Sequence, residues 1–532
     1  MNALFDPHKV PFSTRGSFHC ITWLADDSAF WLRNLRGGDA HTDAGRLLRV
    51  EVPDATDWHL TPDALTAQTP DGALSFRFAS PNQITVTSTG PTLSLQAGAS
   101  KCNYAQGANP IHVCIATQDI RCNITTATGT ASLNARWNGL SSDDITIDLF
   151  RIAPHPVTGP DDFTAFKSAL PVAPPEFSAG RDLASYILWS NDVPAEGALT
   201  WPSVYMSKNW MTNIWSWDHC FVALALEQSL PDLAFEQMQA IFEAQDITGR
   251  LPDYINDRYA YWSFTKPPVH GWTFARLRQM RPDAFGPDRM EQVVRWLENQ
   301  AGFWLSGPAL GGLPAYRHGN DAGWDNATCF AEGGPVASPD LATFLILQLD
   351  EIAALHRALG QPDQATAATN RANALCKALC RDLWTGSAFT ARLTQTGAAV
   401  QSGQSLLLFL PLLLGDRLPA AMCDTQLTQL LTPNRFLTPY GLATEATDRP
   451  LYRANGYWRS PIWAPTTALF ADAFTRCGRP DLAADLARRY CALCTQNGMA
   501  ENHDALTGQG LHDPAFAWTS AVFLLMGNSL IS

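Results

Sequence analysis

The chain has little charge and no cluster of cations. Only 16% of its 532 residues are charged, and the formal net charge is −13 at pH 7. Nucleic-acid affinity depends on Lys and Arg gathered on one surface, and the sequence contains no long run of either residue. We therefore expect a compact globular protein with no nucleic-acid partner.

Long apolar stretches are also missing. Spanning a bilayer takes roughly 18 consecutive apolar residues, whereas the stretch SLLLFLPLLLG (405–415) is shorter and contains a proline. It is interpreted as a buried helix, and we expect no membrane association. The opening MNALFDPHKVPFSTRG has no apolar core of a signal peptide, which favours a cytoplasmic location.

The twelve cysteines show no metal-ligand spacing. Cys376 and Cys380 lie one helical turn apart, and Cys491 and Cys494 form a C-x-x-C pair, but neither pair has a second Cys or His pair nearby. Scattered cysteines in apolar surroundings are typical of reduced thiols. We expect no metal site and no cofactor.

The pattern of the chain changes near residue 170. Before this point, short runs rich in Thr and Val alternate apolar with polar residues between Gly, Pro, Asn and Asp, as in LLRVEV, ALSFRF, QITVTST, TLSLQA and DITIDLF. This alternation predicts an antiparallel β-sandwich over residues 1–170. The Pro-rich segment LPVAPPEFSAG cannot extend a strand ladder, which predicts a linker over 171–180.

Residues 181–532 have helical periodicity. SPDLATFLILQLDEIAALHRALG (338–360) combines an N-cap Ser, a Pro at the first helical position, a stripe of apolar residues spaced by three and four, and a Gly beyond its end. Helices paired through short loops recur at 361–384 and 460–498. About a dozen paired helices favour a mainly α protein with an (α/α)6 toroid.

Tryptophan is abundant in short polar segments of this helical part. Of 18 Trp residues, several lie in NIWSWDHCF (213–221), AYWSFTKPP (260–268), HGNDAGWDNATCF (318–330) and NGYWRSPIWAP (455–465). A single Trp of this kind is commonly a core residue. Sugars, however, need aromatic faces for their C–H groups together with polar side chains for their hydroxyls, so the four segments together indicate a carbohydrate pocket.

Three of these segments and a fourth motif near residue 500 resemble glycoside hydrolase family 63 and the related trehalases, over roughly residues 200–530. GWDNATCF resembles the family segment that carries the acid, and MAENHDALTGQG resembles the segment that carries the base, with His503 where Tyr is common and Ala505 where Pro is common. GYWRSPIWAP resembles a block in which Ser460 stands in place of the usual Gly, and WSWDHCF resembles the segment that holds the non-reducing sugar.

Glycoside hydrolysis needs one protonated carboxyl group and one ionised carboxylate. Asp325 suits the general acid, because the neighbouring Trp324 lowers solvation and so raises the carboxyl pKa. Glu501 lies in a loop of polar residues, where we expect it to stay ionised and act as general base. The resemblance implies inversion, which predicts a separation of about 6.5–9.5 Å between the two carboxyl groups.

Further residues are expected to bind substrate: Trp215, Trp217, Asp218, Trp324, Asn326, Tyr457, Trp458, Arg459 and Trp463. Asp218 is expected either to accept hydrogen bonds from sugar hydroxyls or to lie at the N-terminus of a helix, where the helix dipole favours it. Arg459 either binds an acidic aglycone or pairs with a carboxylate. Asp253 and Asp257 are interpreted as sugar contacts or turn residues.

The resemblance implies an α-glycosidase acting on a small α-glycoside or an oligosaccharide, with an α-glucosidase favoured and the oligomeric state open. A trehalase and a catalytically inactive carbohydrate-binding protein are the alternatives. A terpene-cyclase barrel is disfavoured, because the Asp-rich motif of that class is absent. Release of free sugar from α-glycosides distinguishes a glycosidase from a terpene cyclase, and an inactive sugar-binding protein need not retain both Asp325 and Glu501, which are present here.

Overall fold

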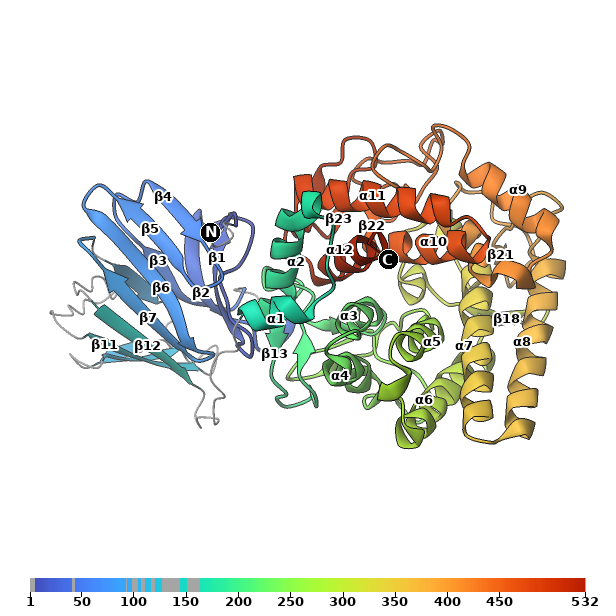
Figure 1. Ribbon diagram of the computed structural model, residues 1–532, viewed down its shortest axis with the longest axis horizontal. Helices are drawn as coiled ribbons and strands as arrows, with labels where there is room; N and C mark the ends of the chain where they lie inside the picture. Colours follow the sequence, from blue (N-terminus) through green and yellow to red (C-terminus); the bar gives the residue numbers. More distant parts are fainter. Residues whose placement is uncertain are drawn as a thin grey trace.

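The computed structural model has two lobes, one of β-strands and one of helices (Figure 1). It describes residues 5–40, 44–91, 93–97, 104–106, 111–115, 120–126, 144–150 and 163–531. The predicted fold class, a helical toroid preceded by antiparallel sheets, is confirmed. Within the described residues, every helix is too short or too polar to span a bilayer.

The N-terminal lobe contains two antiparallel sheets. One has the order β1-β2-β3-β8, and the other has the order β4-β5-β6-β7-β12-β11-β10-β9. Phe76, Ile84 and Val86 are buried while Arg77 is exposed, which is the alternation expected of strands with one face on a core. The strands are β1 (His19–Leu24), β2 (Ala29–Asn34), β3 (Arg46–Glu51), β4 (Asp57–Leu60), β5 (Leu65–Thr69), β6 (Gly72–Ser80), β7 (Gln83–Ser88), β8 (Ser94–Ala97), β9 (Tyr104–Gln106), β10 (Ile111–Ile115), β11 (Ile120–Thr126) and β12 (Asp144–Phe150).

The segment between the lobes is helical and held in place. Helix α1 (Phe163–Ala169) precedes the short 3-10 turn η3 (Pro175–Phe177), and α2 (Ser178–Asn191) follows at once. Arg181 donates hydrogen bonds to the carbonyl oxygens of Pro171, Lys167 and Leu170. The segment predicted as a linker is therefore packed on α2, while the domain limits 1–170, 171–180 and 181–532 stay predictions.

The helical elements of the second lobe form five consecutive hairpins, and the last helix, α12, packs against α2, so that six helix pairs close a ring (Figure 1). The pairs are α3–α4, α5–α6, α7–α8, η7–α9, α10–α11 and α12–α2. Their bounds are α3 (Asp218–Leu226), α4 (Pro231–Phe242), α5 (His270–Met280), α6 (Pro287–Leu305), α7 (Pro339–Ala358), α8 (Pro362–Asp382), η7 (Leu406–Arg417), α9 (Ala420–Leu430), α10 (Ala464–Arg476), α11 (Pro480–Asn497) and α12 (Ala517–Ser529).

Two of the predicted helices differ in detail from expectation. Helix α7 begins after Ser338 as predicted, but the Ser338 hydroxyl bonds to the Asp340 carboxylate instead of capping the backbone. The apolar stretch 405–415 is buried as expected, yet it folds as the 3-10 element η7. Pro411 within it lacks a donor for a regular α-helical bond, and Gly415 breaks the run at φ 55°.

Short sheets at one end of the ring hold the loops that carry the predicted site residues. Strand β15 (Ile214–Trp215) pairs with β16 (Tyr254–Ile255), which pairs with β17 (Ala260–Tyr261). Strand β22 (Ile462–Trp463) pairs with β23 (Asn502–His503), and β23 pairs with β24 (Gly510–Leu511). The sheet β18 (Ala309–Leu310), β19 (Leu313–Tyr316), β20 (Val336–Ala337) and β21 (Arg392–Leu393) flanks the loop of Asp325.

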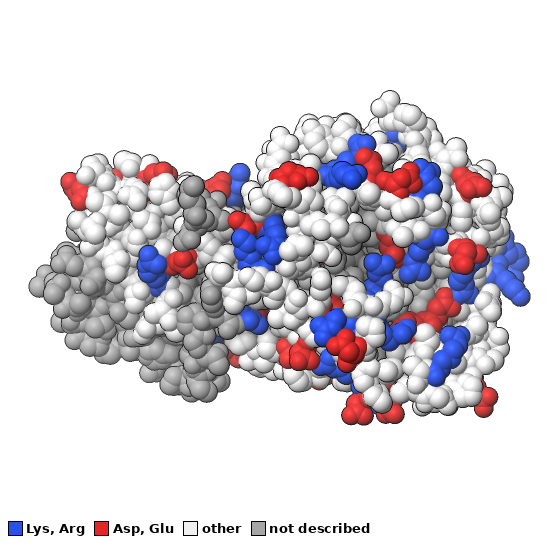
Figure 2. All heavy atoms as spheres, in the orientation of Figure 1, with Lys and Arg blue, Asp and Glu red and all other residues white. Residues whose placement is uncertain are grey.

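Acidic and basic side chains are interspersed on the face of the helical lobe drawn in Figure 2. The described atoms on this face show no large area of Lys and Arg alone.

Candidate active site

Asp218 is a buried carboxylate at the start of α3, at the site end of the ring. Its side chain is 4% exposed, and Oδ2 has no hydrogen-bond partner among the described residues. Burial raises its pKa to about 8, and the charges of Asp253 and Asp325 act in the same direction, while Lys266 opposes them. An unpaired buried carboxyl oxygen is costly in a folded core, so this oxygen is suited to accept a ligand hydroxyl.

Lys266 is a buried ammonium surrounded by these carboxylates, and the sequence analysis missed it. Its Nζ lies 3.5 Å from Asp325 Oδ1 and 3.3 Å from Asp253 Oδ1, and it donates to the Asn320 carbonyl at 3.2 Å. Burial alone lowers the pKa of Lys266, but Asp325, Asp253 and Asp218 together raise it above its ordinary value. It therefore carries a fixed positive charge. A Lys in the aromatic segment AYWSFTKPP was the available signal.

Asp325 lies in the loop HGNDAGWDNATCF and remains accessible, with its side chain 26% exposed. Burial raises its pKa, and Lys266 is the main opposing influence. Trp324 beside it is fully buried, as the predicted desolvation of Asp325 requires. Asp321 in the same loop accepts the backbone N–H of Thr265 at 3.1 Å and holds the loop in place.

A glycine allows this loop to pack closely on an aromatic ring. Gly323 has φ 71°, and a Cβ there would lie 2.7 Å from the indole of Trp217. The Gly before Trp324 thus satisfies both the left-handed backbone and the close approach.

Glu501 is more buried than the sequence suggested. Its residue is 1% exposed, and burial raises its pKa to about 8, with the charge of Asp513 adding to the rise and a hydrogen bond from Tyr457 opposing it. The sequence predicts an ionised carboxylate in a polar loop, whereas the structure encloses Glu501, and this burial opposes its ionisation. Trp518 Nε1 donates to the Glu501 carbonyl at 3.1 Å, so packing of α12 encloses the loop.

Tyr457 brings the carboxylates into one site. Burial raises the pKa of its hydroxyl, followed by the charges of Glu501, Asp325 and Asp218. The hydroxyl is therefore within electrostatic reach of all three groups, and it donates to Glu501. Tyr457 has φ 61°, an uncommon backbone conformation for a bulky residue that is associated with functional sites.

The predicted tryptophans form a contiguous cluster. Trp458 stacks on Trp463 at 4.0 Å between centroids and 5° between planes, and it also contacts Trp324 and Trp217. Trp518, which sequence reasoning missed, packs edge-on against Trp463 and Trp217. Trp217, Trp324, Trp458 and Trp463 are each at most 2% exposed. They offer little surface to a sugar, although the sequence predicts that they bind substrate.

Accessible aromatic surface comes from other residues. Tyr457 is half-buried, and Trp215, which is 8% exposed, lies 5.3 Å from the half-buried Tyr254. Tyr254 stacks on Tyr261 at 4.8 Å. The two tyrosines are neighbours on β16 and β17, a pairing that the sequence did not indicate.

Asn326 and Arg459 join the acid loop to the 455–463 loop. Asn326 Nδ2 donates to the Gly456 carbonyl at 3.0 Å, and Asn326 Oδ1 accepts the Trp458 N–H at 2.9 Å. Arg459 Nε donates to the Asn326 carbonyl at 2.7 Å. The amide of Asn326 thus binds backbone groups, which leaves it little capacity for the predicted substrate contact.

A cavity of about 280 Å³ adjoins Asp325. Its wall includes Arg317, His318 and Arg459 together with Asp325 and Asn326. Two guanidinium groups in the wall make the cavity suitable for an anion.

Of the two further aspartates, only Asp253 lies with the site residues, and the cysteines form no metal site within the described residues. Asp257 accepts the Gly37 N–H at 2.6 Å, between the two lobes, whereas Asp253 lies in the site beside Lys266. The nine described cysteines are free thiols. Within the described ranges, no three His, Cys, Asp or Glu side chains are arranged to hold a metal ion.

A toroid of six helix pairs with buried carboxyl groups beside a tryptophan cluster is typical of a glycoside hydrolase, and comparison with known proteins supports this class. The family model described as "Mannosylglycerate hydrolase MGH1-like glycoside hydrolase domain" matches residues 211–519. The chain belongs to this family, within glycoside hydrolase family 63.

Two relatives illustrate the sequence similarity. The mannosylglycerate hydrolase of Rubrobacter radiotolerans is 23% identical over 403 residues, which cover 58% of this chain and 89% of the relative. The glucosylglycerate hydrolase of Mycolicibacterium hassiacum is 33% identical over 122 residues, 22% of this chain and 27% of that protein.

Solved structures show the same fold. The family 63 mannosylglycerate hydrolase of Thermus thermophilus, in complex with glucose, aligns with a TM-score of 0.54 and 20% identity over 65% of this chain and 99% of that one. Neutral trehalase Nth1 of Saccharomyces cerevisiae aligns with a TM-score of 0.52 and 17% identity over 62% and 74%. A bacterial glucoamylase aligns with a TM-score of 0.60 and 11% identity over 100% of this chain and 95% of that one.

Proposed function

We propose that this protein is an inverting exo-α-glycosidase for a small α-glycoside, with Asp325 as general acid and Glu501 as general base. The observation that carries the proposal is the shared environment of Asp325, Glu501 and Asp218 around the hydroxyl of Tyr457. In this mechanism Asp325 protonates the leaving oxygen and Glu501 activates a water molecule on the opposite face of the sugar. Asp218, Trp215 and Tyr457 hold the glycone.

The cavity beside Asp325 favours an anionic aglycone. The proton donor of a glycosidase faces the leaving group, so the wall with Arg317 and Arg459 lies where an aglycone carboxylate would bind. Relatives named mannosylglycerate and glucosylglycerate hydrolases agree with such a compound. A glucoside remains the favoured substrate. The free thiols of the described cysteines agree with the predicted cytoplasmic location.

The test is hydrolysis of α-glucosylglycerate, α-mannosylglycerate and trehalose, followed by ¹H NMR of the sugar first released. We expect β-glucose from the glucosylglycerate and slower or no turnover of trehalose. Release of the α-anomer would contradict inversion. Preference for trehalose would favour the trehalase alternative, and failure to cleave any α-glycoside in a broad screen would leave the inactive sugar-binding alternative.

The aglycone assignment has its own control. Arg317→Met removes one guanidinium from the cavity wall without touching the carboxylate group around Tyr457. It should weaken turnover of glucosylglycerate and leave turnover of the uncharged methyl α-glucoside unchanged. An equal loss on both substrates would refute an anion-binding role.

A further inference from the structure

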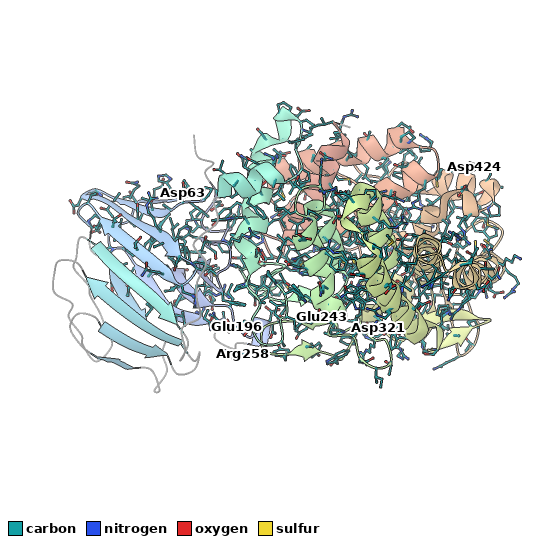
Figure 3. All side chains as sticks on the ribbon, turned by 60° about the horizontal axis from the view of Figure 1, so that its bottom comes forward. Asp63, Glu196, Glu243, Arg258, Asp321 and Asp424 are labelled. Atoms are coloured by element: carbon teal, nitrogen blue, oxygen red, sulfur yellow. The ribbon has the colours of Figure 1, made fainter. Side chains whose placement is uncertain are left out.

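Residues 36–39 of the β-lobe contact the two loops that supply Asp218 and Asp253, and also Glu196. Arg36 forms an ion pair with Glu196, and the Gly37 N–H donates to Asp257 at 2.6 Å. In Figure 3, Glu196 and Arg258, the residue after Asp257, lie close to the β-lobe. We call residues 36–39 the clamp.

Asp39 makes the most specific contacts of the clamp. Its Oδ1 accepts hydrogen bonds from the backbone N–H and the hydroxyl of Thr212, at 2.9 and 3.0 Å. Its Oδ2 accepts from Asn213 Nδ2 at 2.8 Å. Asn213 Oδ1 in turn accepts from Asn256 Nδ2 at 3.0 Å, which links the 212–218 loop to the 253–257 loop. Asp39 thus fixes the residue immediately before β15.

The fit leaves no space for a side chain at Gly38. A Cβ on this residue would lie 1.8 Å from Asn213 Oδ1 and 2.7 Å from Asn256 Nδ2, and its φ is 60°. The backbone of the β-lobe therefore rests directly on the amides that join the two loops.

A second carboxylate, that of Asp513, binds the same segment next to the loop that contains Glu501. Asp513 Oδ1 accepts from Asn209 Nδ2 at 3.1 Å, and the Asp513 carbonyl accepts the Glu501 N–H at 2.7 Å. Residues 209–213 are therefore held between Asp39 of the β-lobe and the loop of Glu501. Through this segment the clamp reaches both the sugar-binding and the base sides of the site.

We propose that Asp39 is a positioning residue, through which the β-lobe sets the geometry of the Trp215–Asp218 and Asp253 loops. The proposal rests on the proposed function for its kinetic consequence but not for its structural one. A β-lobe that served only as a separate binding or solubility module would need none of these contacts. Because Asp39 acts on loops that hold the sugar, it should influence substrate binding more than proton transfer.

The protonation state of Asp39 provides a further test of the proposal. Burial raises its pKa to about 6, the charge of Asp513 acts in the same direction, and Arg33 opposes the rise. The charge of Asp39 in turn contributes to the raised pKa of Tyr254 on β16. An opened, solvated Asp39 would have the lower pKa of an exposed carboxyl group, so the closed clamp takes up a proton more readily than an opened one. Lowering the pH below about 6 should therefore favour the closed clamp.

The structural arm of the experiment is hydrogen–deuterium exchange of peptides covering 207–217 in the full-length protein. Asp39→Asn, which places an amide donor against these donors, and Asp39→Ala should both speed exchange of the Thr212 amide. In the wild type this exchange, corrected for its intrinsic pH dependence, should be slower at pH 5 than at pH 7.5, because protonation of Asp39 favours the closed clamp, and Asp39→Asn should abolish the difference. Asp57→Asn, at an exposed carboxylate of the same lobe, is the matched control.

The kinetic arm uses the same variants. Asp39→Ala should lower kcat/KM by about 10- to 100-fold, as expected for loops displaced by about an ångström, with the larger change in KM. Asp39→Asn should be intermediate and Asp57→Asn unchanged.

Two results would overturn the proposal: wild-type exchange in 207–217 for both Asp39 variants, or altered exchange with unchanged kinetics. If Asp39→Ala does not fold, Asp39→Asn decides alone. If the wild type cleaves no α-glycoside, the proposed function fails, while the exchange arm still decides whether the clamp orders the loops.

Discussion

At the scale of single residues, the candidate site sets the ammonium of Lys266 against the carboxylates of Asp218, Asp253 and Asp325. A cation 3.5 Å from a general acid favours the ionised carboxylate, whereas burial favours the protonated one. For Asp325 burial wins, since the net shift of its pKa is upward. The acid role depends on this balance.

The first prediction separates the acid from the base. Asp325→Asn keeps the shape of the side chain but removes the proton donor, so turnover of an ordinary α-glycoside should fall by about 10²- to 10⁴-fold. An α-glycosyl fluoride should lose far less, because its leaving group needs no proton. Glu501→Gln should slow both substrates alike. The measurement is kcat/KM, and equal losses for Asp325→Asn on both substrates would shift the acid role to another carboxylate.

The second prediction concerns pH. The active form needs an ionised Glu501 and a protonated Asp325, so each pKa sets one limb of the kcat/KM profile. Burial raises the pKa of Glu501 to about 8, so one limb should lie near pH 8. Lys266→Met removes the cation that lowers the pKa of Asp325, so the other limb should move to higher pH. Lys377→Met, on the exposed face of α8, is the control. Two unmoved limbs would argue against Asp325.

At the scale of elements, sequence patterns predicted the helices and strands whose formation depends on neighbouring residues. The caps and spacing around Ser338 and Gly360 predicted α7 to within two residues. The period-two alternation predicted the strands β3, β6, β7 and β12. The apolar stripe of α7 indicates a single buried face, yet Gln348 is also buried and its amide donates to the Leu297 carbonyl. Inner helices of a ring are covered on all sides, which only the tertiary arrangement shows.

Site residues that lie in short contiguous motifs were predicted from the sequence. Residues that join the site through contacts with distant parts of the chain were missed. Asp325, Trp324 and Asp218 stand in short motifs. Lys266 becomes a site residue only through a contact 59 residues away along the chain. The burial of Glu501 arises from Trp518 on α12, so its raised pKa could not be read from the polar residues beside it.

The third prediction tests α7 as the central inner helix. Leu345 is fully buried, and Leu345→Ala should destabilise the protein by about 2–5 kcal/mol, the usual cost of removing a large core side chain. Gln364→Ala, on the exposed side of the neighbouring α8, should change the stability by less than about 0.5 kcal/mol. Urea unfolding followed by circular dichroism provides the comparison. A change below about 1 kcal/mol for Leu345→Ala would contradict the inner position of α7.

At the scale of the whole molecule, the two lobes share buried polar contacts beyond the clamp. Lys208 Nζ donates to Ser13 Oγ at 2.9 Å and to the Ser17 carbonyl at 2.5 Å, and Arg33 donates to the Lys208 carbonyl at 3.0 Å. Tyr186 on α2 donates its hydroxyl to the Pro11 carbonyl at 3.0 Å. Separating the lobes would exchange these bonds for bonds to water, at a net cost of about 0.5–1.5 kcal/mol each.

The fourth prediction follows from this shared interface. Differential scanning calorimetry should show one endotherm for the full chain, because unfolding of either lobe breaks the contacts that stabilise the other. Asp39→Ala should lower the melting temperature of that single transition and should not split it. Two well-separated endotherms in the wild type would show that the lobes unfold independently.

The absence of space at Gly38 has a consequence for how such an enzyme can be rebuilt. Domains joined by flexible linkers can be exchanged between proteins, because each carries its own complete surface. Here the loop that ends at Asp39 supplies acceptors that Thr212 and Asn213 require, and its glycine fits against the amides of Asn213 and Asn256. A chimera that grafts the helical lobe onto a foreign partner must transplant this loop with it, so recombination would preserve the two lobes as one inherited unit.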